Sequence, residues 1–240
     1  MNLPAAALTA FLFSWHLLGP VEAAPAESQI QGKERIEIIE RLQERQREVT
    51  GVRASVVQRK RHPLLAAEAV SQGSLLYQRP NRVRWEVSQP ERIVIVMDGD
   101  TILTYHPDRK EAERRDLRGD FGARSAVDFL ASGMSLAVAE LEKRFQVDLY
   151  RKDGQLVLML TPRSRWLAHA IASVAISQHE GDAIPRQIVV VGQKGDRTEI
   201  TLTEVAINPR FPEDAFTLRL GPGVRVTDVG KSAGERDSDR

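Results

Sequence analysis

The sequence predicts a mainly β protein, in which an antiparallel meander closes into a barrel or a strongly bent sheet beside two amphipathic helices. Three observations lead to this fold class. Many segments alternate apolar and polar residues, turn-forming glycines separate them at roughly ten-residue intervals, and two further segments carry apolar residues at helical spacing. A chain of 240 residues suits a single domain with a substantial core.

The composition narrows the possible chemistry. The chain has 34 lysines and arginines and 33 acidic residues, and the two signs are interspersed along the sequence. No stretch for binding nucleic acid or a membrane surface is therefore indicated. The absence of cysteine excludes disulfides, thiolate metal sites, a cysteine nucleophile and a lipidated N-terminal cysteine.

The N-terminus is expected to be a secretory signal peptide. An apolar run from Ala5 to Leu18 precedes small residues, and cleavage is expected after Ala23 or after Ala26. The run follows no lysine or arginine, and an N-terminal membrane anchor is the alternative, although the run is short for a membrane span. The expected organisation is a signal peptide at 1–23, one domain at 24–230 and a disordered polar tail at 231–240.

The first expected elements are a helix and a strand. Residues 30–47 form an amphipathic helix whose narrow apolar stripe is Ile36, Ile39 and Leu42. A strand follows over 51–57. The basic tract Arg59-Lys60-Arg61 after it is interpreted as a solvated turn, with a basic functional patch as the alternative.

The next segment predicts a hairpin beside a half-buried strand. Residues 82–87 place Val83, Trp85 and Val87 on one face and charged residues on a solvent face. The apolar run 93–97 indicates a strand covered on both faces, which Asp98-Gly99 turns into a second strand over 101–105. The charged segment 110–118 is expected to be a solvated edge strand or a loop.

The remaining elements are a helix and a run of strands. Asp128 is placed to cap a helix with apolar positions from Phe129 to Leu141. Period-two patterns then predict a hairpin over 145–160, with its turn at Asp153-Gly154. Further strands are expected at 171–177, 188–191 and 199–207.

Short motifs between Gly73 and Pro107 carry a family resemblance. They are Arg79-Pro80, Trp85, Asp98-Gly99 and Tyr105-His106-Pro107. In this order and spacing they resemble the periplasmic lipoprotein-carrier family, LolA and its relatives. The C-terminal stretch is similar to the closing strand motif of that family, in Asn208-Pro209-Arg210-Phe211-Pro212, Phe216 and Gly221-Pro222-Gly223-Val224-Arg225-Val226.

The resemblance implies a half-open antiparallel β-barrel of the LolA/LolB type, with an α lid over an apolar cavity. It also implies a periplasmic carrier that shields lipoprotein acyl chains between the inner and the outer membrane, without catalysis, cofactor or metal. The implied partners are an acylated lipoprotein or other lipid cargo, an inner-membrane release complex or exporter, and an outer-membrane acceptor. The carrier would act as a monomer and bind no nucleic acid.

The resemblance also implies a set of site residues. Arg79 would bond to lid backbone or polar groups and favour the closed state, whereas the alternative is a surface arginine that ends a strand before Pro80. Trp85 and Tyr105 match inner-surface positions, with a plain core role as the alternative. Aliphatic and sulfur-containing side chains would complete the ligand-binding wall, namely Val83, Ile95, Met97, Leu103, Leu158 and Leu160.

Two departures from the family pattern leave the cargo open. Val83 stands where many carriers have an aromatic residue, and the segment 101–105 lacks the tryptophan common before the tyrosine. The alternative function is therefore a LolA-like carrier of another lipid or lipid-linked product, working with a dedicated exporter. An envelope-stress regulator of the same fold would be expected to have an additional C-terminal domain.

An enzyme is the alternative class of protein. The sequence has no Gly-x-Ser-x-Gly elbow, no His-Glu-x-x-His pair and no phosphate-binding loop. Its five histidines are scattered, and Asp98 and Asp100 flank a glycine as residues of hairpin turns do. No catalytic residue is therefore expected.

Overall fold

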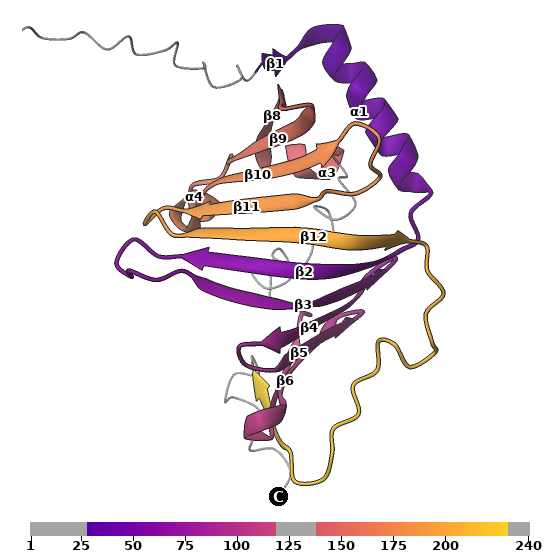
Figure 1. The fold of residues 1–240 in the computed structure, drawn as a ribbon, viewed down its shortest axis with the longest axis vertical. Helices are drawn as coiled ribbons and strands as arrows, with labels where there is room; N and C mark the ends of the chain where they lie inside the picture. Colours follow the sequence, from indigo (N-terminus) through magenta and orange to yellow (C-terminus); the bar gives the residue numbers. More distant parts are fainter. Residues whose placement is uncertain (1–27, 119–137, 230–240) are drawn as a thin grey trace, which may run out of the picture.

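The fold is one open sheet of 13 strands, seen in a computed structural model that describes residues 28–118 and 138–229. The strand order is β1-β8-β9-β10-β11-β12-β2-β3-β4-β5-β6-β7-β13, so two meanders meet where β12 pairs with β2 (Figure 1). All neighbouring strands are antiparallel except β7 and β13, which are parallel. The predicted fold class, mainly β with few helices, is confirmed.

The described elements follow one another along the chain as β1 (Ser28–Ile30), α1 (Gly32–Arg47), β2 (Gly51–Arg61), β3 (Ala69–Gln78), β4 (Arg82–Gln89), β5 (Ile93–Asp98), β6 (Thr101–His106), a 3-10 turn (Pro107–Arg109), β7 (Glu111–Asp116), α3 (Val138–Glu142), β8 (Phe145–Lys152), β9 (Gln155–Pro162), α4 (Arg165–Ala170), β10 (Ile171–His179), β11 (Gln187–Gly192), β12 (Arg197–Ile207) and β13 (Arg225–Val229). Helix α1 runs along the right side of Figure 1, past the ends of β8 to β12.

Local turn chemistry accounts for the hairpins. Gly99 and Gly154 have φ values of 63° and 74°, which glycine adopts without steric penalty. They close the turns between β5 and β6 and between β8 and β9, so both predicted hairpins are confirmed. The strands predicted at 171–177, 188–191 and 199–207 are β10, β11 and β12.

The pairing register sorts the strand residues onto two faces. Directly opposed residues of an antiparallel pair share a face, so Leu75, Trp85 and Ile95 lie on the same side. We name this the inner face, because it carries the hydrophobic core. Arg84 and Val96, which pair with each other, lie on the outer face.

The core lies between the inner face and the helices. Ile38 and Leu42 of α1, and Val138 and Leu141 of α3, are buried in the same cluster as the inner-face residues of β8, β9 and β10. Burial of each such side chain contributes about 1.5–3 kcal/mol. This contact therefore holds α1 on the inner face.

Helix α1 buries a stripe that agrees only in part with the expected one. Leu42 is buried and Ile39 packs against the core, as expected, whereas Ile36 is 55% exposed and Ile38 and Gln46 are buried instead. Positions four residues apart stay nearly in line on a helix with about 3.6 residues per turn. An i, i+3, i+6 series drifts round the helix, and this carries Ile36 away from the sheet.

Two further expectations about strands are wrong. Strand β2 extends through Arg61, so the basic tract is a strand end and not a turn. Strand β7 within 110–118 is not at the sheet edge, because β13 pairs with it.

Other expectations lie wholly or partly outside the described residues. Of the helix expected from Asp128, only α3 falls in the described part, and the expected signal peptide and polar tail lie outside it.

Candidate functional site

Arg79, which follows β3, joins the sheet to α1. Its guanidinium Nη2 donates to the main-chain oxygen of Gln46, in the last turn of α1, at 2.6 Å. Its main-chain N donates to the carbonyl of Thr50 at 2.9 Å. The last carbonyls of a helix lack intrahelical partners and carry partial negative charge, so a cation is favourable there. Arg79 is thus bonded to helix α1 and is not a free surface side chain.

Tyr77 supports this contact from the inner face of β3. Burial raises the pKa of the Tyr77 hydroxyl, and the charge and hydrogen bond of the Arg79 guanidinium lower the pKa in part. The hydroxyl therefore stays protonated at neutral pH and accepts a hydrogen bond from Arg79. Sequence reasoning missed Tyr77, although its position two residues before Arg79 on an alternating strand was a usable signal.

Asn208 holds the connection between α1 and β2. Its side-chain Oδ1 accepts from the main-chain N of Thr50 at 2.7 Å, from the main-chain N of Gly51 at 3.1 Å and from the Thr50 hydroxyl at 3.0 Å. Its Nδ2 donates to the carbonyl of Glu48 at 2.8 Å. The residue has a φ of 51°, a left-handed value that asparagine tolerates better than most residues. The C-terminal end of α1 is thereby fastened to the end of β12.

The N-terminal half of α1 is held by charged contacts near the surface. Arg35 pairs with Glu142 of α3 at 2.6 Å, and Arg151 of β8 pairs with Glu34 at 3.0 Å. Strand β1, directly before α1, pairs with β8. Exposed ion pairs contribute at most about 1 kcal/mol each, so these contacts position the helix more than they stabilise it.

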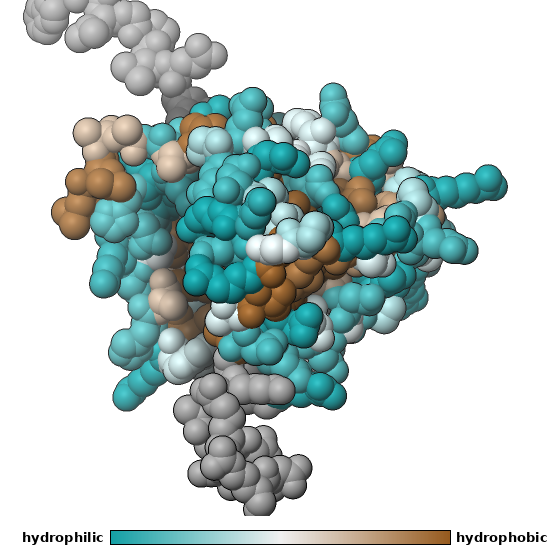
Figure 2. Space-filling model, turned by 90° about the horizontal axis from the view of Figure 1, so that it is seen from below, coloured by the Kyte–Doolittle hydropathy of each residue, from teal (hydrophilic) through white to brown (hydrophobic). Residues whose placement is uncertain are grey.

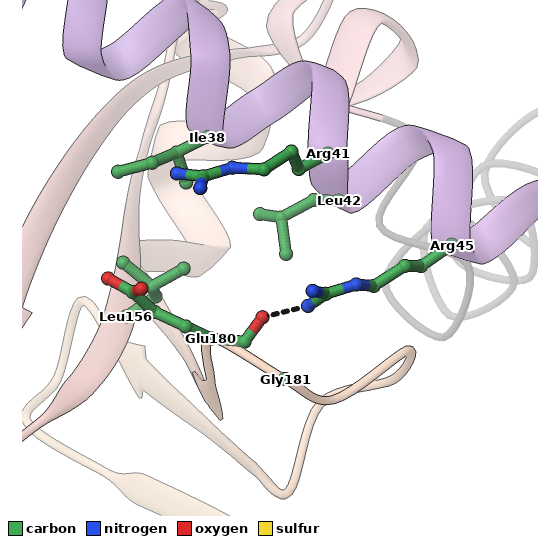
Figure 3. A pocket seen from close by; sticks show the side chains of 7 residues that line it. All are labelled: Ile38, Arg41, Leu42, Arg45, Leu156, Glu180 and Gly181. Carbon is green, nitrogen blue, oxygen red and sulfur yellow. Dashed lines mark hydrogen bonds between the residues drawn. The ribbon is translucent and has the colours of Figure 1, made fainter.

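A small cavity lies where α1 crosses the turn after β10 (Figure 3). Ile38, Leu42 and Leu156 form its apolar part, and Arg45 reaches across it to donate to the carbonyl of Glu180. Its volume of about 120 Å³ is smaller than that of a cavity of about 150 Å³ that holds one benzene molecule, and a long acyl chain needs far more space. The described conformation is therefore a packed one, with α1 seated on the inner face.

The expected wall residues occupy two environments on the inner face. Leu158 and Leu160 of β9 are 1% and 0% exposed and belong to the core. Val83, Trp85 and Ile95 are half-buried on β4 and β5, and Met97 beside them is buried. The register places all six on one face, continuous through β2 and β3.

Leu103 and Tyr105 lie on the outer face, contrary to the expectation for the wall. Tyr105 pairs with Val94 and Leu103 with Val96, and these valines alternate with the inner-face residues of β5. Ile102 and Thr104 of β6 take the inner positions instead. Strand β6 has a threonine on each face, so apolar and polar residues do not alternate clearly along it. The sequence pattern alone therefore does not show which face is buried.

The charged face of β4 is covered, and is not the solvent face that the sequence indicated. Arg84 Nη1 donates to the carbonyls of Ala215 and Thr217 at 3.3 and 3.1 Å. The guanidinium carbon of Arg82 lies 5.0 Å from the ring centroid of the buried Phe216, a cation–π contact. The segment after β12 therefore packs along the outer face of the sheet.

Within 28–118 and 138–229, no group of three or more His, Cys, Asp or Glu side chains could hold a metal ion. Asp98, at the hairpin turn, pairs with Arg82 at 3.2 Å. No helix in the described part of the chain is long and apolar enough to cross a membrane.

A family model described as outer membrane lipoprotein carrier protein LolA matches residues 47–219. The chain belongs to the LolA family. The match begins at the last residue of α1, includes β2 to β12 and the segment over the outer face, and ends before β13. Within this LolA-family chain, Arg79 lies inside the matched range and its partner Gln46 lies directly before it.

Several known proteins are similar to this chain. The outer-membrane lipoprotein carrier protein of Bordetella avium is 27% identical over 155 residues, 64% of this chain and 69% of the relative. That of Xylella fastidiosa is 29% identical over 161 residues, 67% and 72% of the two chains. A solved structure of an uncharacterized conserved protein from Thermus thermophilus has a TM-score of 0.49 at 15% identity, covering 81% of this chain and 98% of its own. A LolA superfamily protein from Nitrosomonas europaea has a TM-score of 0.41 at 14% identity, covering 76% and 97%.

Proposed function

We propose that this LolA-family protein is a soluble periplasmic carrier that shields the acyl chains of lipoproteins on their way from the inner to the outer membrane. The bond between Arg79 and the Gln46 carbonyl supports this most strongly. It joins a helix that covers the apolar inner face to a strand that forms this face. A lipid container needs such a wall and a cover that can leave it, and α1 is the cover in this proposal.

In this proposal loading requires α1 to leave the part of the inner face that it covers, because the cavity between α1 and the turn after β10 is small beside an acyl chain. Removing Ile38 and Leu42 from the core costs about 2 kcal/mol each, and releasing the Arg79 hydrogen bond costs about 1.5–3 kcal/mol. An acyl chain gains about 0.8 kcal/mol for each sheltered methylene, so about eight methylenes offset these losses. Loading and release would be close to balanced for cargo that shelters about eight methylenes on the protein.

The pivot of this movement is proposed at residues 48–51. Asn208 fastens this segment to β12 through its side chain, so α1 would rotate about its own C-terminal end. The bond from Arg79 lies within one turn of the pivot and opposes the rotation. At the other end of α1, opening would break the pair between Arg35 and Glu142 and the short pairing of β1 with β8.

The proposed partners follow from this cycle. An inner-membrane release complex would load the carrier, and an outer-membrane acceptor would receive the cargo. The carrier would work as a monomer, without catalysis or a cofactor.

A second candidate is a LolA-like carrier of another lipid or lipid-linked product, paired with a dedicated inner-membrane exporter. Val83 favours this candidate. It is half-buried on the inner face between Tyr77 and Met97, at a position where the family often has an aromatic residue. An aliphatic side chain there leaves more room at the wall.

Native mass spectrometry of the protein purified from the periplasm of its host tests the proposal. A bound triacylated lipoprotein is the expected result, whereas a free lipid or lipid-linked product would favour the second candidate. Arg79→Leu is expected to fold but to hand over cargo poorly. Arg53→Leu, exposed on the outer face of β2, is the matched control and is expected to transfer cargo normally. Equal transfer by the two variants would remove Arg79 from the role proposed for it.

A further inference from the structure

Three loops meet at the end of the sheet opposite the Arg79 contact. They are the β2–β3 hairpin (59–69), α4 with the residues before it (163–170) and the β11–β12 turn (192–197), all on the left of Figure 1. The main-chain N of Gln193 donates to the carbonyl of Ala170 at 3.3 Å, which joins the turn to α4. A Cβ built on Gly195 would lie 3.2 Å from Pro63 Cγ, so the turn also touches the hairpin. We name this surface the hairpin end.

The hairpin end carries the most exposed large apolar side chains of the described residues. Leu64 is 87% exposed, and Leu65 and Trp166 are each 65% exposed. Figure 2 shows apolar side chains projecting at the left margin, the side on which Figure 1 places the hairpin. Single exposed apolar residues are ordinary, but three gathered on touching loops indicate an interaction surface.

The same surface concentrates positive charge. Its three loops hold seven lysines and arginines, at 59, 60, 61, 163, 165, 194 and 197, against two carboxylates, Glu68 and Asp196, whereas the whole chain is nearly balanced. Arg61 and Arg197 stand directly opposite each other across β2 and β12, and like charges in this position repel. Arg59 pairs with Glu68 and Arg197 with Glu199, whereas among the described residues Lys60, Arg61, Arg165 and Lys194 form no ion pair. The fold thus brings the basic tract Arg59-Lys60-Arg61 together with basic residues of two other loops.

We propose that the hairpin end docks on a bilayer surface rich in anionic phospholipids. Leu64, Leu65 and Trp166 enter the headgroup region, where tryptophan is favoured because one end of its ring system is apolar and the other polar. The lysines and arginines lie within a Debye length of the anionic headgroups, and the negative charge of the headgroups offsets the repulsion among these basic side chains. Leucines at the tip of a projecting hairpin fit a deformable apolar medium better than a rigid protein surface.

Docking at this end sets the orientation of the molecule. Strand β2 runs from the Asn208 clamp to the hairpin, so Arg79 and the C-terminal end of α1 face away from the membrane. The inference goes beyond the proposed carrier function, because it does not depend on which lipid is carried. Its test uses empty vesicles and no cargo.

Vesicle flotation of the protein without residues 1–23 tests the proposal. Vesicles of phosphatidylethanolamine with about one quarter phosphatidylglycerol should bind the protein at about 0.05 M salt, and binding should fall at least tenfold at about 0.5 M salt or on phosphatidylcholine vesicles. The double variant Leu64→Ser, Leu65→Ser should lose at least tenfold in binding. Lys60→Gln with Arg61→Gln should weaken binding only to the anionic vesicles. Ile36→Ser and Val226→Ser, which remove exposed apolar side chains elsewhere, are the matched controls and should bind normally.

A second readout reports on insertion. In a Trp85→Phe background Trp166 is the remaining tryptophan beyond residue 23, and its emission should shift to the blue on anionic vesicles. All substituted loop residues are exposed, so the thermal melt should be unchanged in each loop variant. Absence of flotation on anionic vesicles would overturn the proposal, as would equal losses in the control variants. Retention by a membrane protein in detergent, without binding to lipid vesicles, would overturn it in favour of a protein partner.

Discussion

Replacing Arg79 with leucine should loosen α1 without unfolding the sheet. The substitution removes a charged hydrogen bond to the Gln46 carbonyl, which contributes about 1.5–3 kcal/mol. The Asn208 clamp and the buried Ile38 and Leu42 remain, so the loss falls on the seated position of α1. A loss of about 2 kcal/mol corresponds to about a 30-fold larger population of the open helix.

Hydrogen exchange of the α1 amides measures this population. In Arg79→Leu, the amides of residues 32–47 should exchange about 30-fold faster than in the wild type, whereas those of β8 to β10 should keep their protection. Arg53→Leu makes the same change on the exposed outer face of β2 and should leave α1 unaffected. If α1 exchanges at the wild-type rate in Arg79→Leu, the bond does not hold the helix and the reasoning is refuted.

Three other substitutions test separate parts of the structure. Asn208→Ala removes four side-chain hydrogen bonds and should lower the free energy of unfolding by about 2–4 kcal/mol in urea titration; a loss within error would show that the clamp is dispensable. Gly73→Ala would place a Cβ 1.8 Å from the carbonyl oxygen of Glu86, so thermal melting should show a loss of about 1–3 kcal/mol or more, and an unchanged melt would contradict this register. The hydrogen bond from Arg186 lowers the pKa of Asp182, so its stabilisation is present above the unfolded-state pKa and is lost as the pH falls through the lower folded-state value. Asp182→Asn should therefore flatten the acid limb of the stability curve, and an unaltered limb would exclude this pair as its cause.

Much of the fold could be predicted from the sequence because its signals are local. The turn at Gly99 depends only on the backbone conformation of that residue. The alternation that includes Val83 and Trp85 arises because these side chains pack beside those of the neighbouring strand. Helix α4 was missed, although Ser164 caps it by accepting from the main-chain N of Leu167 at 3.3 Å. A capping serine before a helix of six residues is a weak signal beside the period-two patterns on either side.

The parts of the site that were missed depend on distant contacts. The sequence predicts that the outer face of β4 is exposed to solvent, because Arg82 and Arg84 are charged. Only folding brings Phe216 and the segment around it onto this face. The sequence shows Asn208 as part of a motif, but its hydrogen bond to Thr50 joins residues 158 positions apart, which no local pattern predicts. Tyr105 was assigned to the wall by resemblance, and only the pairing register shows that it lies on the outer face.

Site-specific photo-crosslinking tests the central claim most directly, namely that the inner face holds acyl chains. A photoreactive phenylalanine analogue would replace Trp85 on the inner face and, in a matched variant, Tyr105 on the outer face. The account predicts crosslinks to a lipoprotein from position 85 and none above background from position 105. Equal yields from both positions, or crosslinks from position 105 alone, would contradict it.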